Sequence, residues 1–110
     1  MHVDSMSTRF WQAVLKGRKH WIIYPADDRP FLYEDNATLA FAADAFAPDL
    51  AANPLMRLAR PQEAVVNEGE LIFVPHDSPH QVRTLEDTLA LAGNYVDSSN
   101  FDASRGFLDF

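Results

Sequence analysis

Two side chains at the start of the chain have the types and spacing to bind one metal ion. His2 and Asp4 are two residues apart, and in an extended strand such residues point to the same face. The chain contains no cysteine, so thiolate metal sites and disulfides are excluded. A metal would need a third ligand from elsewhere in the chain. Two histidines and one carboxylate form the facial triad of non-haem Fe(II) oxygenases, which leaves coordination positions open for other molecules.

His76 and His80 compete for the third position. His80 begins a predicted strand directly after the loop 75–79, at the mouth of a barrel, whereas His76 lies on the loop itself. A strand holds a side chain more rigidly than a loop does, so His80 is the predicted ligand. The His-x-Asp pattern alone is short and arises often by chance. The alternative interpretation is a frayed terminal residue at His2 and a hydrogen-bonded turn histidine at His80.

The elements that must position these residues are short strands. β-branched and aromatic residues, separated by turn residues, predict about six of them. The first two are expected to form a hairpin around Gly17, and the last two another strand pair around residues 85–87. The third and fourth flank a predicted tight turn at 67–69. The predicted strands cover residues 7–15, 19–24, 62–67, 70–74, 80–84 and 88–96.

The remaining segments predict an insert and a tail. Asn36 can cap an Ala-rich stretch, so a short helix is predicted over residues 36–46. Prolines then punctuate an irregular insert, and a second helix is predicted to start in the tail, residues 98–110, with Ser98 or Ser99 as its cap. Short strands with a short helical insert favour an all-β fold. We predict a β-sandwich or a jelly-roll barrel of the cupin kind, the double-stranded β-helix.

Composition restricts the classes of function. The chain has 110 residues, of which 47% are apolar, which predicts one small globular domain. The net charge of -7 argues against a broad nucleic-acid-binding surface. No apolar run approaches membrane-spanning length, and the first residues lack the features of a signal peptide. We therefore expect an intracellular protein, cytoplasmic or nuclear, with no membrane partner and with its oligomeric state left open.

The sequence around His2, Asp4 and His80 resembles the JmjC family, most closely the small hydroxylases made of a JmjC domain alone. The resemblance runs in order and with matching gaps over nearly the whole chain. It implies that residues 1–110 are the C-terminal part of a JmjC domain, because in the family a longer region precedes the His-x-Asp motif. The matching segments are His2-Val3-Asp4, Trp11, residues 16–25, residues 67–75 followed by His80, and residues 84–88, 94–96 and 99–101.

The resemblance also implies a role for individual residues. Lys19 matches the basic residue that pairs with the distal carboxylate of 2-oxoglutarate, and a cation suits a buried dicarboxylate. Asn94 matches a polar residue near the metal and cosubstrate, and Gln12 a position that contacts the cosubstrate. Trp11 and Trp21 are interpreted as core residues. The implied iron ligands are His2, Asp4 and His80.

The implied activity is that of an Fe(II)- and 2-oxoglutarate-dependent oxygenase. Such an enzyme would hydroxylate a side chain of a protein or peptide substrate, or demethylate one by hydroxylation. Two departures are visible: Ala92 stands where relatives often have Thr, and residues 77–79 differ from the usual rim sequence. Two alternatives stay open, a non-catalytic JmjC fragment that serves as a binding module and another cupin metalloenzyme that does not use 2-oxoglutarate.

Overall fold

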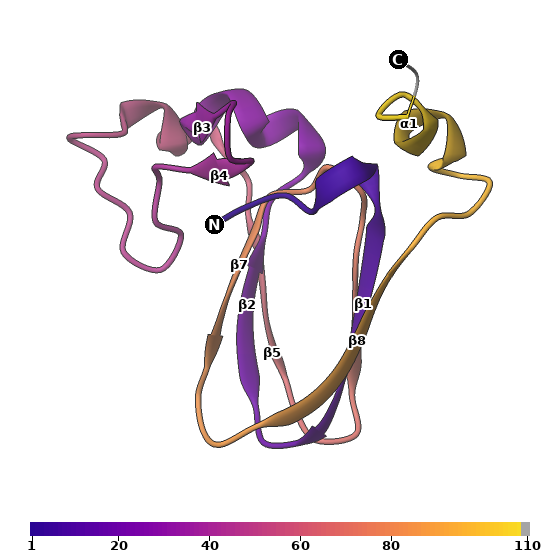
Figure 1. Cartoon of the computed structure of the whole chain (residues 1–110). Helices are drawn as coiled ribbons and strands as arrows, with labels where there is room; N and C mark the ends of the chain where they lie inside the picture. Colours follow the sequence, from indigo (N-terminus) through magenta and orange to yellow (C-terminus); the bar gives the residue numbers. More distant parts are fainter. Residues whose placement is uncertain (109–110) are drawn as a thin grey trace.

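Two three-stranded antiparallel sheets face each other in the computed structural model, which describes residues 1–108 (Figure 1). One sheet has the strand order β6-β1-β8 and the other β5-β2-β7. This arrangement confirms the predicted all-β, partial jelly-roll fold. The strands are β1 (Arg9–Lys16), β2 (Lys19–Ile23), β5 (Gln62–Val66), β6 (Leu71–Val74), β7 (His80–Thr84) and β8 (Leu89–Tyr95).

The two strands joined by each predicted turn lie in different sheets, so the predicted pairings of β1 with β2, of β5 with β6 and of β7 with β8 are wrong. β1 pairs with β6 and β8, whereas β2 pairs with β5 and β7. The physical reason lies in the apolar faces of the strands. Val14 of β1 and Trp21 of β2 belong to one buried cluster with Val66 and Val74. The two strands therefore pack face to face across the core, and the turn at Gly17 crosses from one sheet to the other.

A second core lies on the outer face of β2. Ile22 and Tyr24 point away from the sandwich and pack under the insert, against Leu32, Phe41 and Met56. This alternation lets one strand serve two cores, because successive side chains of a strand point to opposite faces. The insert elements are the 3-10 turns η2 (Ala26–Phe31) and η3 (Pro54–Leu58), and the strands β3 (Glu34–Asp35) and β4 (Ala40–Phe41).

The helix predicted over residues 36–46 is wrong. This segment instead turns between β3 and β4, and Asp35 Oδ1 accepts a hydrogen bond of 2.9 Å from the Ala37 N–H. The Phe41 N–H donates to the Met1 carbonyl at 3.2 Å, so β4 runs along the N-terminal chain. Helix propensity is a weak preference, and this tertiary pairing overrides it.

The tail closes over the start of the chain. A short helix, α1 (Phe101–Arg105), begins after Asn100, so the predicted cap at Ser98 or Ser99 is wrong. Residues 109–110 of the predicted helix lie outside the described residues. Asn100 is buried, and its Nδ2 donates to the Ser7 carbonyl at 2.9 Å. This bond fixes the turn η1 (Ser5–Ser7), which follows Asp4 directly.

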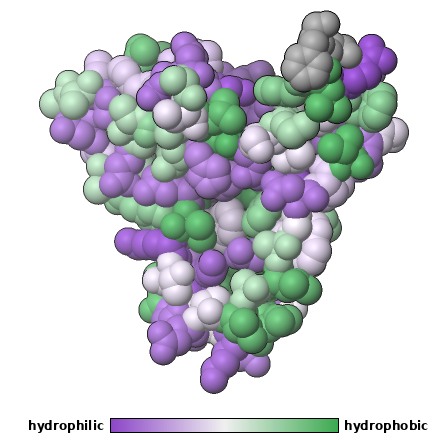
Figure 2. All heavy atoms as spheres, in the orientation of Figure 1, coloured by the Kyte–Doolittle hydropathy of each residue, from purple (hydrophilic) through white to green (hydrophobic). Residues whose placement is uncertain are grey.

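The outer face of the β6-β1-β8 sheet is apolar and open to solvent. Phe73 of β6 and Leu91 of β8 are 61% and 58% exposed. Figure 2 shows a group of hydrophobic residues on the right of the narrow lower end, next to hydrophilic residues at its left and tip. Within residues 1–108, no helix is long and apolar enough to cross a membrane.

Two glycines with positive φ provide a test of the crossing between the sheets. A Cβ on Gly17 (φ +90°) would lie 2.5 Å from the Asp87 carbonyl oxygen, whereas a Cβ on Gly69 (φ +83°) would meet nothing within 4 Å. We expect Gly69→Ala to lower the free energy of unfolding by about 1 kcal/mol, the cost of the backbone conformation. Gly17→Ala should cost about 3 kcal/mol, because a backbone clash is added. Urea denaturation of both variants measures the difference. Equal losses of stability would contradict the close approach of the Gly17 turn to the Asp87 carbonyl.

Candidate metal centre

The N-terminal chain is held in the sheet beside β7. The His2 N–H donates to the His80 carbonyl at 3.1 Å, and the His80 N–H donates to the His2 carbonyl at 3.0 Å. His2 also pairs with Ala40 of β4 on its other side. Val3, the next residue, is buried in the core under the insert. These contacts place His2 directly opposite His80, the last of the candidate ligands, although the two are far apart in the sequence.

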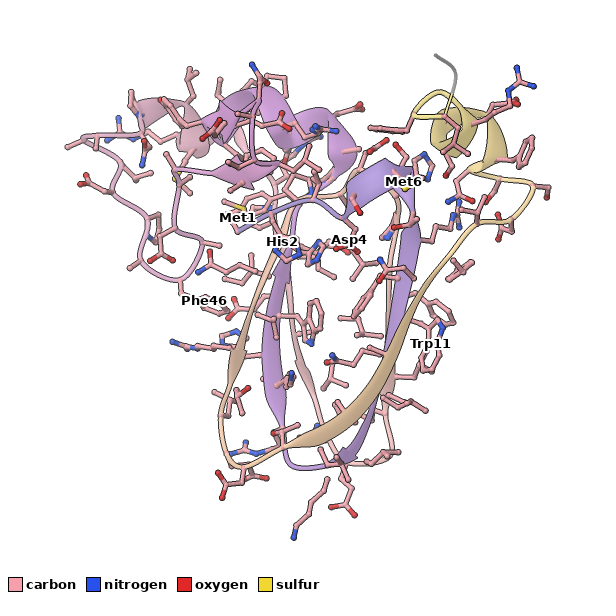
Figure 3. All side chains as sticks on the ribbon, in the orientation of Figure 1. Met1, His2, Asp4, Met6, Trp11 and Phe46 are labelled. Carbon is pink, nitrogen blue, oxygen red and sulfur yellow. The ribbon has the colours of Figure 1, made fainter. Side chains whose placement is uncertain are left out.

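Three potential ligand atoms converge where the N-terminal chain passes between the sheets. Figure 3 shows His2 and Asp4 next to each other at this end of the sandwich. One ligand atom each from His2, Asp4 and His80 lies within 4.8 Å of the others. Asp4 Oδ1 is 3.3 Å from His2 Nε2 and 3.7 Å from His80 Nε2. Neighbouring ligands of an ion bound at about 2.1 Å stand about 3 Å apart, so small side-chain movements would suffice to hold one ion.

His80 is oriented by its other ring nitrogen. Its Nδ1 lies 2.9 Å from the Ser78 carbonyl oxygen, which can only accept a hydrogen bond. The Nδ1–H therefore donates, and the lone pair of Nε2 faces Asp4. Burial lowers the pKa of His80, against the opposing effects of the Ser78 hydrogen bond and the Asp4 charge. The neutral imidazole is thus favoured, which is the form that binds a metal.

Asp4 is favoured in its ionised form. Burial alone would raise its pKa, but the hydrogen bond from His2 and the charges of His80 and His2 outweigh burial. The net effect holds the pKa of Asp4 below its ordinary value of 3.8. A carboxylate and two imidazoles, one of them oriented by a backbone carbonyl, suit a divalent transition metal.

The structure brings His80 into the cluster and leaves His76 outside it. The loop between them is held from two sides. Ser7 Oγ donates to Asp77 Oδ1 at 2.9 Å, and Arg29 Nη1 lies 3.5 Å from the same oxygen. Asp77 itself has a φ of +59°, which turns the chain into β7. The ligand role of His80 stays a prediction, and its geometry fits that role.

The residues predicted to bind the cosubstrate lie at different depths. Asn94 Nδ2 donates to Thr8 Oγ1 at 3.1 Å, and Asn94 also lies close enough to Asp4 to help lower the pKa of that carboxyl. Gln12 is buried on the inner face of β1, and its Oε1 has no hydrogen-bond partner within residues 1–108. Lys19 is half-buried at the far end of β2, opposite Thr84. Asn94 therefore borders the metal cluster, whereas Gln12 and Lys19 lie deeper along the sandwich.

Comparison with known proteins agrees with the fold. The cupin-like domain family matches residues 1–101. The chain belongs to this family, in its JmjC branch. It is 35% identical over 97% of its length to the 2-oxoglutarate and iron-dependent oxygenase JMJD4 of Danio rerio. It is 34% identical over 90% of its length to the same-named protein of Gallus gallus.

A plant relative extends this comparison. The chain is 30% identical over 90% of its length to the arginine-specific demethylase JMJ22 of Arabidopsis thaliana, of which it covers 21%. It covers 26% of the Danio rerio protein and 24% of the Gallus gallus protein. The chain thus spans about a quarter or less of the length of these relatives.

Two aromatic residues next to the cluster of this JmjC cupin were not predicted to be there. The Phe10 ring is stacked on His80 with centroids 6.4 Å apart, and the Trp21 ring lies 5.8 Å from His80. The alternation of side chains along a strand could have predicted their position. Phe10 shares the inner face of β1 with Gln12, and Trp21 shares the inner face of β2 with Lys19. These rings form an apolar wall that keeps water from one side of His80.

Stability of the metal-free chain should depend on pH through His80. Its folded pKa lies below the ordinary value of 6.5, so the unfolded chain binds this proton more tightly. Stability is therefore expected to fall as the pH drops below about 6.5. Asp4 affects stability at lower pH. Because its pKa is lowered in the folded chain, it contributes stability that is present above pH 3.8 and lost as the pH falls further. Urea midpoints in a chelating buffer, measured on both sides of about pH 6.5, test the His80 effect.

The matched variant for this test is His80→Gln, which cannot take up a proton at this position. Its midpoint should change less between the two pH values than that of the wild type. An equal change in both proteins would show that the loss of stability comes from other groups.

Proposed function

We propose that this chain is the metal-binding core of an Fe(II)- and 2-oxoglutarate-dependent oxygenase. The observation that carries the proposal is the convergence of His2, Asp4 and His80, with one ligand atom each, within 4.8 Å. Two imidazoles and one carboxylate match the facial triad of non-haem iron oxygenases. The names of the Danio rerio and Gallus gallus relatives support the same two cofactors.

The donor set fits iron in both charge and orientation. The carboxyl of Asp4 is held ionised, and the neutral His80 ring presents Nε2 because Ser78 accepts the hydrogen bond from Nδ1. Zinc would also accept such ligands, but structural zinc sites are usually closed by a fourth protein ligand. Within residues 1–108, no fourth His, Cys or carboxylate joins this cluster. The open positions are what an oxygenase needs for cosubstrate and O₂.

The polar groups between the sheets would suit a small dicarboxylate. Lys19 supplies a cation on the inner face of β2, and no ion pair occupies it within residues 1–108. Gln12 adds a buried polar atom without a partner, and Asn94 adds a polar group at the metal end. We propose that Lys19 binds the distal carboxylate of 2-oxoglutarate and that Gln12 and Asn94 contact the cosubstrate or the metal ligands.

The residues of the chain then have distinct tasks. When bound, iron and 2-oxoglutarate would supply the oxidising power to hydroxylate a C–H bond. Asp4 and the two histidines hold the ion, and the Ser78 carbonyl fixes the direction of the His80 ring. The rings of Phe10 and Trp21 exclude water beside His80. Exclusion of water strengthens the electrostatic interactions in the site.

We further propose that the substrate is a side chain of a protein or peptide. Support comes from relatives named as an arginine-specific demethylase and as lysine-specific demethylases. The net charge of -7 favours a basic peptide over an acidic one, because like charges repel during encounter. Hydroxylation of a side chain, or demethylation through hydroxylation, are the reaction types proposed.

Anaerobic titration with Fe(II) and 2-oxoglutarate tests the proposal. A chelate of the two in this site should give a visible charge-transfer absorption band. Asp4→Ala and His80→Ala should abolish the band, since each removes a ligand. Lys19→Ala should weaken 2-oxoglutarate binding by about a hundredfold, as expected for loss of a buried charge-assisted bond of about 3 kcal/mol.

His76→Ala is the matched control, because His76 lies on the neighbouring loop and outside the cluster. It should leave the band unchanged. Loss of the band in His76→Ala but not in His80→Ala would contradict the ligand assignment. Absence of any band in a wild-type chain that is folded by circular dichroism would contradict the proposed cofactors.

A further inference from the structure

Trp21 carries a hydrogen-bond donor that the rest of the described chain leaves unpaired. Its side chain is 2% exposed, and its Nε1 has no hydrogen-bond partner within residues 1–108. An indole N–H can only donate, and buried Trp residues usually satisfy it. Burial without an acceptor is costly, so an unpaired indole N–H in a core requires an explanation.

The placement of Trp21 suggests what the acceptor is. Trp21 lies on the inner face of β2 between Lys19 and Ile23, and Ile23 is the register partner of His80. The Trp21 ring is 5.8 Å from the His80 ring. Alternate residues of a strand are about 6.6 Å apart. A molecule that reaches from the metal ligands toward Lys19 must therefore pass Trp21.

The facing sheet offers few polar groups along this path. Ala90 and Ala92 occupy the inner face of β8, opposite Val14 and Gln12 of β1. Gln12 has the second unpaired polar atom of this interior, its buried Oε1. Between Asn94 at the metal end of this path and Lys19 at its far end, Gln12 and Trp21 can form hydrogen bonds to a polar ligand, whereas the two alanines cannot.

We propose that the Trp21 indole N–H donates a hydrogen bond to an oxygen of 2-oxoglutarate and so helps to set its affinity and position. This inference rests on the proposed function. Trp21 thereby has two tasks: its ring fills the core between the sheets, and its N–H binds the cosubstrate. Ala92 of β8 carries no side-chain polar atom and cannot replace this donor.

Indole N–H signals in ¹⁵N–¹H correlation spectra test the contact directly. The chain has two tryptophans, and Trp11→Phe and Trp21→Phe assign their signals. The sample is the full chain loaded with Zn(II), a diamagnetic substitute for iron, and the titrant is 2-oxoglutarate. The Trp21 indole proton should move downfield and saturate with the calorimetric binding curve. The Trp11 signal should stay in place, because Trp11 packs beside Gly93 on the outer face of its sheet.

Calorimetry on the two Phe variants provides the second measurement. Trp21→Phe keeps an aromatic ring and removes the donor. It should weaken 2-oxoglutarate binding to the Zn(II)-loaded chain about tenfold, as expected for a hydrogen bond to a charged acceptor. Trp11→Phe is the matched control and should bind within about twofold of the wild type.

The outcomes separate this inference from the function on which it rests. If 2-oxoglutarate binds but the Trp21 signal does not move, or if Trp21→Phe binds it as tightly as the wild type, the inference is wrong and the proposed function stands. If the wild-type chain binds Zn(II) but no 2-oxoglutarate, the proposed function and this inference both fall. If Trp21→Phe does not fold, the indole titration of the wild type decides alone.

Discussion

The candidate metal centre depends on one pair of backbone hydrogen bonds, those exchanged by His2 and His80. This reciprocal pairing, with N···O distances of 3.1 and 3.0 Å, joins the first residues of the chain to β7. It sets the two imidazole rings 4.4 Å apart and lets Asp4 reach both. A chain end normally frays unless it is tied down. Here the insert supplies the tie, because β4 pairs with the other side of His2 and the core under the insert buries Val3.

The sequence was sufficient to predict the strands but insufficient to pair them. Runs of β-branched and aromatic residues between turn residues identify the strands, and β1, β2, β5, β6, β7 and β8 lie where that pattern placed them. The pattern does not identify the neighbour of a strand. Val14 and Trp21 bury their side chains equally well in a hairpin or across a sandwich, so the choice between these depends on contacts far apart in the sequence. The same reason explains the missed β3–β4 turn, where pairing of Ala40 with His2 prevails over an Ala-rich helix preference.

For the site, residue type and spacing predicted which side chains come together where extended backbone or a strand fixes the direction of the side chain. His2, Asp4 and His80 come together because a strand period and a strand start determine their directions. Trp21 shows the limit of the same reasoning. The hydrophobicity of Trp assigns Trp21 to the core, and its ring is indeed in the core. A single hydrophobicity value for the whole residue does not, however, represent the one polar atom of the indole. Finding that atom unpaired requires the positions of all its neighbours, which local sequence does not contain.

Apolar rings and polar groups lie side by side around His80. The Phe10 ring of β1, stacked on His80, and the tilted Trp21 ring of β2 cover it from both sheets and exclude water. Asn94 of β8 is the register partner of Phe10 and lies close enough to Asp4 to help lower the pKa of that carboxyl. The strand pair β1 and β8 therefore supplies both a ring that shields His80 from water and the polar side chain beside Asp4. A neutral imidazole and an ionised carboxylate are favoured at neighbouring positions for this reason.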